Sequence, residues 1–161
     1  MKRALLAGTF DPPTLGHLDL IERGAKLCEE LYLAIAVNPA KKSALSLEDR
    51  EEMLRLLTPS LSNVKISSFT GLTAEFAQQH KINFLIRGLR SAADLERELQ
   101  LATMNKTISG VETVLLPGNP LYAHISSSLI RELAFNKADL SRLVPAAIAD
   151  KISLIFYRSP T

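Results

Sequence analysis

Residues 8–17, GTFDPPTLGH, follow an apolar run and combine two glycines, two prolines, a carboxylate and a histidine in one short turn. Glycine lets a backbone approach a ligand closely, and proline stiffens the turn that presents the backbone N–H groups. His17 adds a hydrogen-bond donor at the far end of the turn. A phosphate group is the ligand that suits this chemistry.

Four further segments of related chemistry follow other short apolar runs. They are residues 38–42 (NPAKK), 70–73 (TGLT), 87–90 (RGLR) and, by way of residues 117–120, residues 122–128 (YAHISSS). Hydroxyls, glycines and fixed positive charges hold phosphate through N–H donors and guanidinium forks. The loops after parallel strands share the carboxyl edge of a sheet. The sequence therefore predicts one polyphosphate-binding cleft at that edge.

Each segment alone also has an ordinary interpretation. Lys41 and Lys42 fit solvated loop charges, and the serine run fits a helix N-cap. Arg87 and Arg90 fit ion pairs with the acidic residues at 94, 96 and 98. Because five such coincidences would have to fall on one sheet edge, we favour the binding site.

The elements that must position these segments alternate along the chain. Apolar runs predict strands at 3–7, 31–37, 64–69, 83–86 and 112–116. Apolar stripes and N-cap residues predict helices at 18–28, 46–57, 73–80 and 93–106, and another from near Ser127. The alternation predicts a single-domain α/β fold over 1–161, a doubly wound, Rossmann-like five-stranded parallel sheet with helices on both faces. Short flanking helices are expected from about residue 139.

Composition narrows the class of protein without naming a function. A chain of 161 residues with 47% hydrophobic residues and a formal charge of +2 fits one globular domain, with neither a nucleic-acid surface nor a membrane surface. No apolar run approaches the roughly 18 residues of a membrane-spanning helix. The single cysteine, Cys28, cannot form a disulfide within the chain. We expect a cytoplasmic protein.

Several common chemistries do not fit the sequence. It has neither the P-loop pattern G-x-x-x-x-G-K-[ST] nor a dinucleotide-binding G-x-G-x-x-G. His17, His80 and His124 show no metal-ligand spacing with one another or with Cys28, so no protein metal site is expected. Cys28 lies on the apolar stripe of the first helix, which favours burial over reactivity.

The motifs together match a known family. Residues 8–17 are similar to the (H/T)-x-G-H signature of the nucleotidyltransferases, and ISSSLIRE (125–132) resembles their second signature. With NPAKK, IRGLR (86–90), DLERELQLATMN (94–105) and YAHISSSLIRE (122–132), the chain resembles the bacterial phosphopantetheine adenylyltransferases from residue 3 to about residue 145. The resemblance implies transfer of the adenylyl group of ATP to 4'-phosphopantetheine without a covalent intermediate, giving dephospho-coenzyme A and pyrophosphate. It also implies Mg²⁺, bound through the ATP phosphates.

The resemblance implies roles for individual residues. His17, Lys41 and Arg90 are implied as catalytic, with His17 stabilising the charge of the pentacoordinate transition state. The acceptor is implied to bind Thr9, Lys41, Thr73 and Arg87. ATP is implied to bind Thr9, Phe10, His17, Gly88, Leu89, Arg90, Glu98, Tyr122, Ala123, His124, Ile125, Ser126, Ser127 and Ser128.

The resemblance further implies a homo-hexamer and feedback binding of coenzyme A in the same cleft. Three departures concern the adenine side of the site. Family members commonly read Tyr-Pro-Gly where this chain has Leu6-Ala7-Gly8, often carry an aromatic residue at His124, and have a more apolar segment at Pro117-Gly118-Asn119. These departures change packing around the base and leave the phosphate contacts intact.

Other functions remain open at this stage. An adenylyltransferase acting on nicotinate or nicotinamide mononucleotide shares a similar serine-rich signature, although NPAKK and IRGLR argue against it; a cytidylyltransferase fits less well. A non-catalytic nucleotide sensor on the same fold would have no reason to keep Thr9, His17 and Lys41 together.

Overall fold

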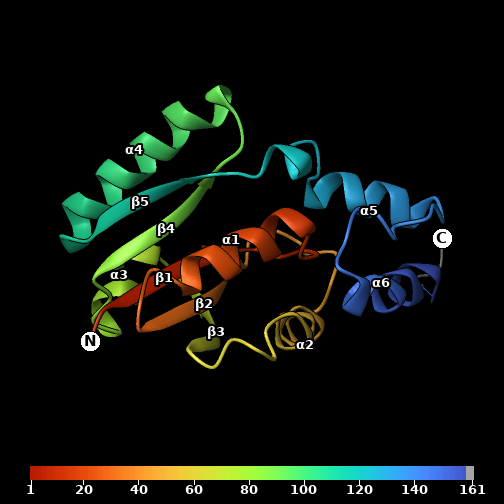
Figure 1. The fold of residues 1–161 in the computed structure, drawn as a ribbon, viewed down its shortest axis with the longest axis horizontal. Coiled ribbons are helices and arrows are strands. Elements are labelled where there is room, and N and C mark those ends of the chain that lie inside the picture. Colours follow the sequence, from red (N-terminus) through yellow and green to blue (C-terminus); the bar gives the residue numbers. More distant parts are fainter. Residues whose placement is uncertain (159–161) are drawn as a thin grey trace.

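The computed structural model describes residues 1–158, which form one parallel sheet, its covering helices and a helical end (Figure 1). The strands are β1 (Arg3–Gly8), β2 (Glu30–Val37), β3 (Val64–Thr70), β4 (Phe84–Leu89) and β5 (Glu112–Pro117). The helices are α1 (Leu15–Ala25), α2 (Leu47–Leu57), α3 (Thr73–Gln79), α4 (Ala92–Ser109), the 3₁₀ turn η1 (Pro120–Tyr122), α5 (Ser127–Phe135) and α6 (Ala146–Arg158).

All strand pairs are parallel, in the order β3-β2-β1-β4-β5, which confirms the predicted five-stranded α/β sheet. Strand order reverses where β1 lies beside β4. In an open parallel sheet, ligands bind beyond the carboxyl ends of the strands at such a switch point. The residues after Gly8 and Leu89 therefore occupy the position at which this fold binds ligands.

Alternate residues of β1 face opposite sides of the sheet, as the period of a strand requires. Ala4 and Leu6 pack in a core with Ile21 of α1 and Leu54 of α2. Leu5 packs on the other face, in a core that includes α3. Helices therefore cover both faces of the sheet, as the apolar runs buried on both sides predicted.

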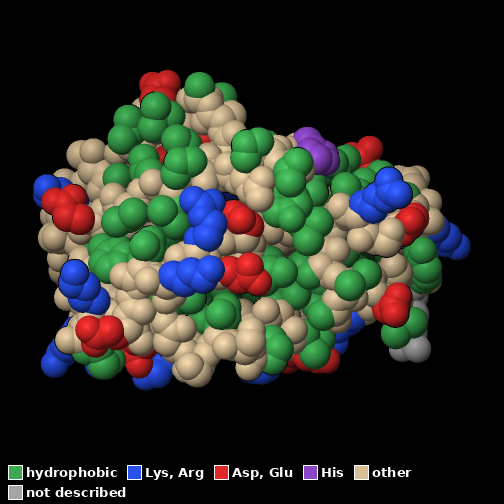
Figure 2. Space-filling view, in the orientation of Figure 1, with side chains coloured by type: hydrophobic (Ala, Val, Ile, Leu, Met, Phe, Trp, Pro, Cys, Tyr) green, Lys and Arg blue, Asp and Glu red, His purple; other side chains and the backbone are tan. Residues whose placement is uncertain are grey.

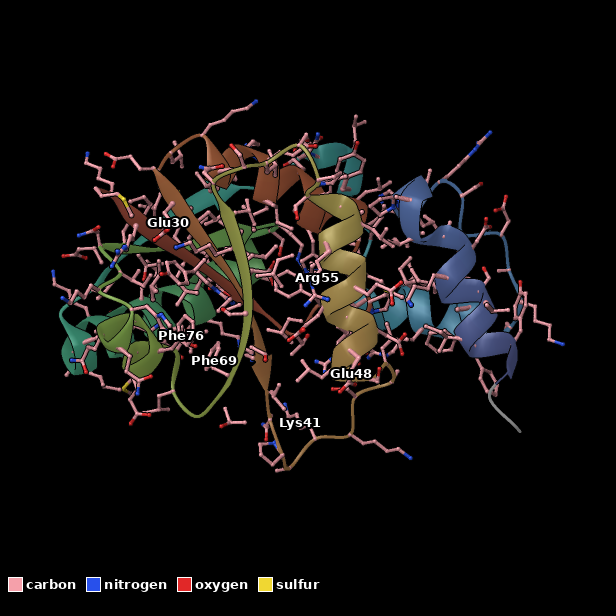
Figure 3. The ribbon with its side chains drawn as sticks, turned by 90° about the horizontal axis from the view of Figure 1, so that it is seen from below. Glu30, Lys41, Glu48, Arg55, Phe69 and Phe76 are labelled. Atoms are coloured by element: carbon pink, nitrogen blue, oxygen red, sulfur yellow. The ribbon has the colours of Figure 1, made fainter. Side chains whose placement is uncertain are left out.

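Aromatic packing holds α3 on the second face. Phe69 of β3 lies beside Phe76 of α3, with ring centroids 4.8 Å apart (Figure 3). The ring of His80, at the end of α3, stacks on Phe76 with a centroid distance of 4.1 Å. This histidine therefore has a packing role at the C-terminus of the helix.

The last strands extend further than the sequence pattern indicated. β4 runs to Leu89 because its pairing with β5 continues through Arg87↔Leu115 and Gly88↔Leu116 to Leu89↔Pro117. Arg87 thus lies within the strand, although a polar residue followed by glycine had suggested a loop. Its side chain is consequently held by the sheet at the carboxyl edge.

The C-terminal part forms its own apolar cluster at one end of the molecule. Ile148 and Ile152 of α6 are fully buried against Ile130 of α5 and Met53 of α2. Helices α5 and α6 lie side by side (Figure 1). The stretch in which short flanking helices were expected from about residue 139 contains turns followed by the 13-residue α6. Within residues 1–158, no helix has the length and apolar character needed to cross a bilayer.

Candidate functional site

A cleft of about 480 Å³ opens at the switch point between β1 and β4. It brings together most of the residues that the sequence selected, from segments far apart in the chain. The selected residues that line it are Thr9, Phe10, His17, Thr73, Arg87, Gly88, Arg90, Glu98, Tyr122, Ala123, Ile125, Ser126 and Ser127. In particular, His17 and Arg90 share this one cleft, as a single anion-binding site requires.

Lys41, Leu89, His124 and Ser128 are not among the lining residues. Lys41 lies in the exposed loop after β2, which runs out from the body of the sheet (Figure 3). The backbone N–H of Lys41 donates to the Asn38 carbonyl oxygen at 3.0 Å, so a turn forms the tip of this loop. Lys41, which was predicted to be catalytic, therefore does not line the cleft and lies on the exposed loop between β2 and α2.

His17 is held at the start of α1 by a reciprocal capping arrangement with Thr14. The Thr14 N–H donates to His17 Nδ1 at 3.0 Å, and Thr14 Oγ1 accepts from the His17 N–H at 3.3 Å. Because Nδ1 accepts a backbone proton, the neutral imidazole carries its own proton on Nε2. The ring therefore presents an N–H donor that is free for a ligand.

The electrostatic surroundings keep this imidazole neutral. Burial, together with the positive charges of Arg90 and then Arg87, lowers the pKa of His17 to about 4. At neutral pH the group is consequently a neutral hydrogen-bond donor rather than an imidazolium.

Phe10 supports the turn rather than contacting a ligand with its ring. Its side chain is 0% exposed and packs edge-on against His17, with centroids 5.1 Å apart. The residue has φ of 46°, a left-handed conformation that is uncommon outside glycine. A Cβ at Gly8 would lie 3.1 Å from the Phe10 ring, a tight contact that a larger residue could make only if the ring shifted. The Phe10 ring therefore braces the turn and is not exposed to a ligand.

The cleft arginines already carry carboxylate partners. Arg87 makes two bonds to Glu98, Nε to Oε2 at 2.8 Å and Nη2 to Oε1 at 2.8 Å, and its Nη1 donates to the Ala7 carbonyl at 3.0 Å. Arg90 Nε lies 3.3 Å from Asp94 Oδ2. The ion pairs considered from the sequence therefore exist, and they lie within the cleft. A bidentate carboxylate occupies the guanidinium edge that a phosphate would use.

The serine-rich segment forms the opposite wall. Ser126 caps α5, its Oγ accepting from the Leu129 N–H at 3.1 Å. Ser127 Oγ donates to the Pro12 carbonyl at 2.8 Å, which joins α5 to the turn after β1. The first N–H groups of a helix lack partners within it and attract anions.

The Pro117-Gly118-Asn119 segment packs directly on the end of β4. The Gly118 N–H donates to the Leu89 carbonyl at 2.7 Å, and a Cβ at Gly118 would lie 3.3 Å from that oxygen. Arg23 Nη1 donates to the Pro117 carbonyl at 2.7 Å. This segment thus supports the backbone at Leu89.

Sequence reasoning missed the buried charges that brace the turn. Asp11 and Arg50 are only 7% and 3% exposed. Arg50 Nη1 donates to the Thr9 carbonyl at 3.1 Å, and Arg131 Nη1 donates to the Asp11 carbonyl at 2.6 Å. Arg50 stands among exposed charges of α2, so its type and spacing gave no signal. Asp11 was visible as a carboxylate inside the signature, but its partners come from another loop.

Further cleft residues come from α4, where Asp94 and Arg97 join the predicted Glu98. Among the described residues there is no group of three or more histidine, cysteine or acidic side chains able to hold a metal ion. Within the described part of the chain, the charged side chains that line the cleft are three arginines, Arg87, Arg90 and Arg97, and three carboxylates, Asp19, Asp94 and Glu98.

Comparison with known proteins agrees with this geometry. Residues 5–133 match the model of the cytidylyltransferase-like family. The chain is 42% identical to the phosphopantetheine adenylyltransferase of Streptomyces coelicolor over 153 residues, covering 95% of this chain and 96% of that protein. It is 45% identical to that of Finegoldia magna, covering 96% of each chain, and 41% identical to that of Thermobifida fusca, covering 94% and 93%.

The fold also has a solved counterpart. The crystal structure of a putative nicotinate-nucleotide adenylyltransferase from Vibrio parahaemolyticus superposes with a TM-score of 0.67, covering 94% of this chain and 99% of that one. At 16% identity this likeness concerns the fold alone.

Proposed function

Because this chain belongs to the phosphopantetheine adenylyltransferases of the cytidylyltransferase-like family, we propose that the cleft between β1 and β4 is its active site. The enzyme transfers the adenylyl group of ATP to 4'-phosphopantetheine, giving dephospho-coenzyme A and pyrophosphate. The observation that carries the site assignment is the neutral Nε2–H of His17, which shares one cleft with Arg87, Arg90 and the start of α5.

The chemical step follows from what these groups supply. A phosphate oxygen of the acceptor attacks the α-phosphorus of ATP. The bond between the α-phosphorus and the oxygen that bridges it to the β-phosphorus breaks, and pyrophosphate leaves with that oxygen. Such a displacement asks the protein mainly for positioning and for stabilisation of developing charge. His17 Nε2–H donates to the α-phosphate, Arg90 adds positive charge beside it, and no covalent intermediate is required.

ATP lies with its β- and γ-phosphates toward the start of α5. Ser126 and Ser127 at this first turn line the cleft, with their hydroxyls bonded to the Leu129 N–H and the Pro12 carbonyl. The helix dipole contributes about 0.3 to 1 kcal/mol toward an anion at this place. The backbone of Thr9, Gly88 and Leu89 holds the remainder of the nucleotide.

The acceptor lies along the other side of Arg87. A second pocket, of about 240 Å³, adjoins this arginine and Thr73 and is lined mainly by apolar residues, among them Leu101 and Met104 of α4. A phosphate on Arg87 would leave the pantetheine arm to enter this apolar pocket. Arg87 therefore marks the boundary between the two substrates.

Magnesium enters with ATP in this proposal, as part of the nucleotide substrate. Both carboxylate oxygens of Asp11 accept backbone N–H groups, and both of Glu98 face Arg87. Mg²⁺ prefers oxygen ligands and usually retains phosphate and water around it. The other carboxylates that line the cleft, Asp19 and Asp94, pair with Arg23 and Arg90. The carboxylates of the site are thus engaged with the protein, which supports binding of the ion through the ATP phosphates.

Self-association is proposed through α4 and β5. Hydrophobic side chains gather over these elements (Figure 2), and Leu99 and Met104 of α4 are 50% and 58% exposed. We expect light scattering to give about six times the chain mass of 17.7 kDa, and Leu99→Glu to lower that multiple. A monomeric wild-type protein at assay concentration would contradict the hexamer.

Coenzyme A is proposed to bind the same cleft as a feedback ligand. Coenzyme A contains the pantetheine phosphate and the adenylyl group of the reaction product, so it can use the Arg87 subsite and the nucleotide-binding backbone of Thr9 and Gly88 together. Competition with ATP in equilibrium binding would support this, whereas simultaneous binding of both would contradict it.

Release of pyrophosphate from ATP and magnesium tests the assignment, with 4'-phosphopantetheine and nicotinate mononucleotide supplied in parallel. We expect product only with 4'-phosphopantetheine. Loss of a well-placed donor typically lowers turnover by about a hundred- to a thousandfold, which we expect for His17→Ala with smaller effects on ATP affinity. His80→Asn, which changes a histidine packed on Phe76, is the matched control. Normal turnover by a folded His17→Ala protein would refute the role of His17.

A further inference from the structure

We propose that Asp11 is a positioning residue that fixes the loop carrying Lys41, and that it affects the reaction through that loop. This inference rests on the proposed function, in which Lys41 binds substrate phosphate. It assigns a purpose to a buried carboxylate for which the chemical step has no direct use.

The contacts of Asp11 tie together two segments that are far apart in sequence. Its Oδ1 accepts the Leu45 N–H at 2.8 Å, and its Oδ2 accepts the Ala44 N–H at 2.9 Å. The residue is 7% exposed. A buried carboxylate needs such donors, and these two amides leave each oxygen with a partner.

The anchored residues control where Lys41 lies. The loop leaves β2 after Val37 and enters α2 at Leu47. Its tip, residues 38–42, is exposed and is closed by the hydrogen bond from the Lys41 N–H to the Asn38 carbonyl. Between these ends, the Asp11 carboxylate accepts the N–H of Ala44, which is three residues beyond Lys41. The reach of the Lys41 side chain therefore depends on this attachment.

The same aspartate is joined to the opposite wall of the cleft. Arg131 Nη1 donates to the Asp11 carbonyl at 2.6 Å, and Nη2 donates to Ser128 Oγ at 3.0 Å. Asp11 thus links the Lys41 loop, the turn after β1 and the start of α5. Movement of any one of these would be transmitted to the other two through short polar contacts.

The first test compares two Asp→Asn changes beside the same loop. Asp11→Asn keeps one acceptor but turns an NH₂ group toward a backbone N–H. We expect kcat/KM for 4'-phosphopantetheine to fall by about tenfold or more, since bonds to a charged group are lost. Asp49→Asn at the start of α2 keeps an acceptor for the Ser46 hydroxyl, and we expect a change below about twofold.

A double-mutant cycle separates a role through Lys41 from a general structural role. If Asp11 acts through the loop, adding Asp11→Asn to Lys41→Ala should lower kcat/KM for 4'-phosphopantetheine by less than about twofold. Adding Asp11→Asn to His17→Ala should still lower it by about tenfold. A tenfold loss of kcat/KM that also occurs in the Lys41→Ala background would overturn this inference and leave the proposed function unaffected. Wild-type turnover by Lys41→Ala would refute the proposed role of Lys41, and this inference with it.

A second variant reaches the same contact from the loop. Ala44→Pro removes the N–H that Asp11 Oδ2 accepts and leaves the signature turn unchanged. Thermal unfolding establishes that each variant is folded, and hydrogen exchange of residues 38–46 reports the attachment directly. We expect faster exchange and the same loss of activity in Ala44→Pro; unaltered exchange in both variants would show that Asp11 does not hold the loop.

Discussion

The titration of His17 offers a direct test of the electrostatics of the cleft. Burial, Arg90 and Arg87 together lower its pKa to about 4. At pH 6 an ordinary histidine with a pKa of about 6.5 is roughly three-quarters protonated, whereas a group with a pKa of about 4 is about 1% protonated. We therefore expect the His17 ring to remain neutral across the pH range in which the enzyme is assayed.

Two-bond ¹H–¹⁵N correlation spectra of the imidazoles measure this directly. Between about pH 6 and pH 8 the His17 cross-peaks should not move, and their ¹⁵N shifts should show a proton on Nε2 and none on Nδ1. His17→Asn identifies the resonance by its loss. The Nδ1 assignment follows from the Thr14 N–H donor at 3.0 Å.

The causes of the low pKa can be separated by removing one charge. Because burial is the largest cause, Arg90→Met should raise the pKa of His17 but leave it below 6.5. A midpoint near 6.5 in the unliganded wild-type protein would refute the reasoning, since it would mean that the ring is solvated and the arginines are distant. A proton on Nδ1 would refute the capping geometry separately.

The same shift predicts acid sensitivity, alongside three effects of substitution. In the unfolded chain His17 binds a proton near pH 6.5, whereas in the folded chain it does so only near pH 4. The free energy of unfolding should therefore fall by about 1.4 kcal/mol for each pH unit as the pH drops through that window. Denaturant unfolding measures this fall, which should be absent in His17→Asn. Arg87→Lys, which cannot keep the two-bond fork to Glu98, should raise the KM for the acceptor by about tenfold and the KM for ATP less in steady-state assays. Gly118→Ala should lower the free energy of unfolding by about 1 to 3 kcal/mol, because the added Cβ meets the Leu89 carbonyl oxygen. Gly88→Ala should cost less, because its Cβ meets only the end of the flexible Leu20 side chain. Equal melting temperatures of the two variants would contradict this. Ile148→Ala should cost about 2 to 5 kcal/mol of unfolding free energy without altering the KM for ATP, as its side chain is fully buried in the C-terminal apolar cluster and does not line the cleft.

Local patterns in the sequence were sufficient to predict the parallel sheet and the sheet edge at which the cleft lies. Strand runs buried on both faces, separated by amphipathic helices, leave few topologies open, and the parallel order follows. The same patterns placed His17, Arg87 and Ser126 at one edge before their contacts were known. What they could not supply is the pairing across loops, because the partners of Asp11 and Arg50 depend on how the β2–α2 loop folds back.

The arginine–carboxylate pairs show why the site could not be read completely from residue types. Arg87 was expected on the acceptor and Glu98 on ATP, yet in the structure the two groups bind each other through two bonds of 2.8 Å. A phosphate that binds the same guanidinium edge must replace that carboxylate, and exchanging one bidentate anion for another keeps the arginine satisfied throughout. The released Glu98 is then an acceptor for hydroxyl groups, which ribose supplies. The observed ion pair is therefore compatible with both predicted contacts, provided that the two substrates separate the pair between them.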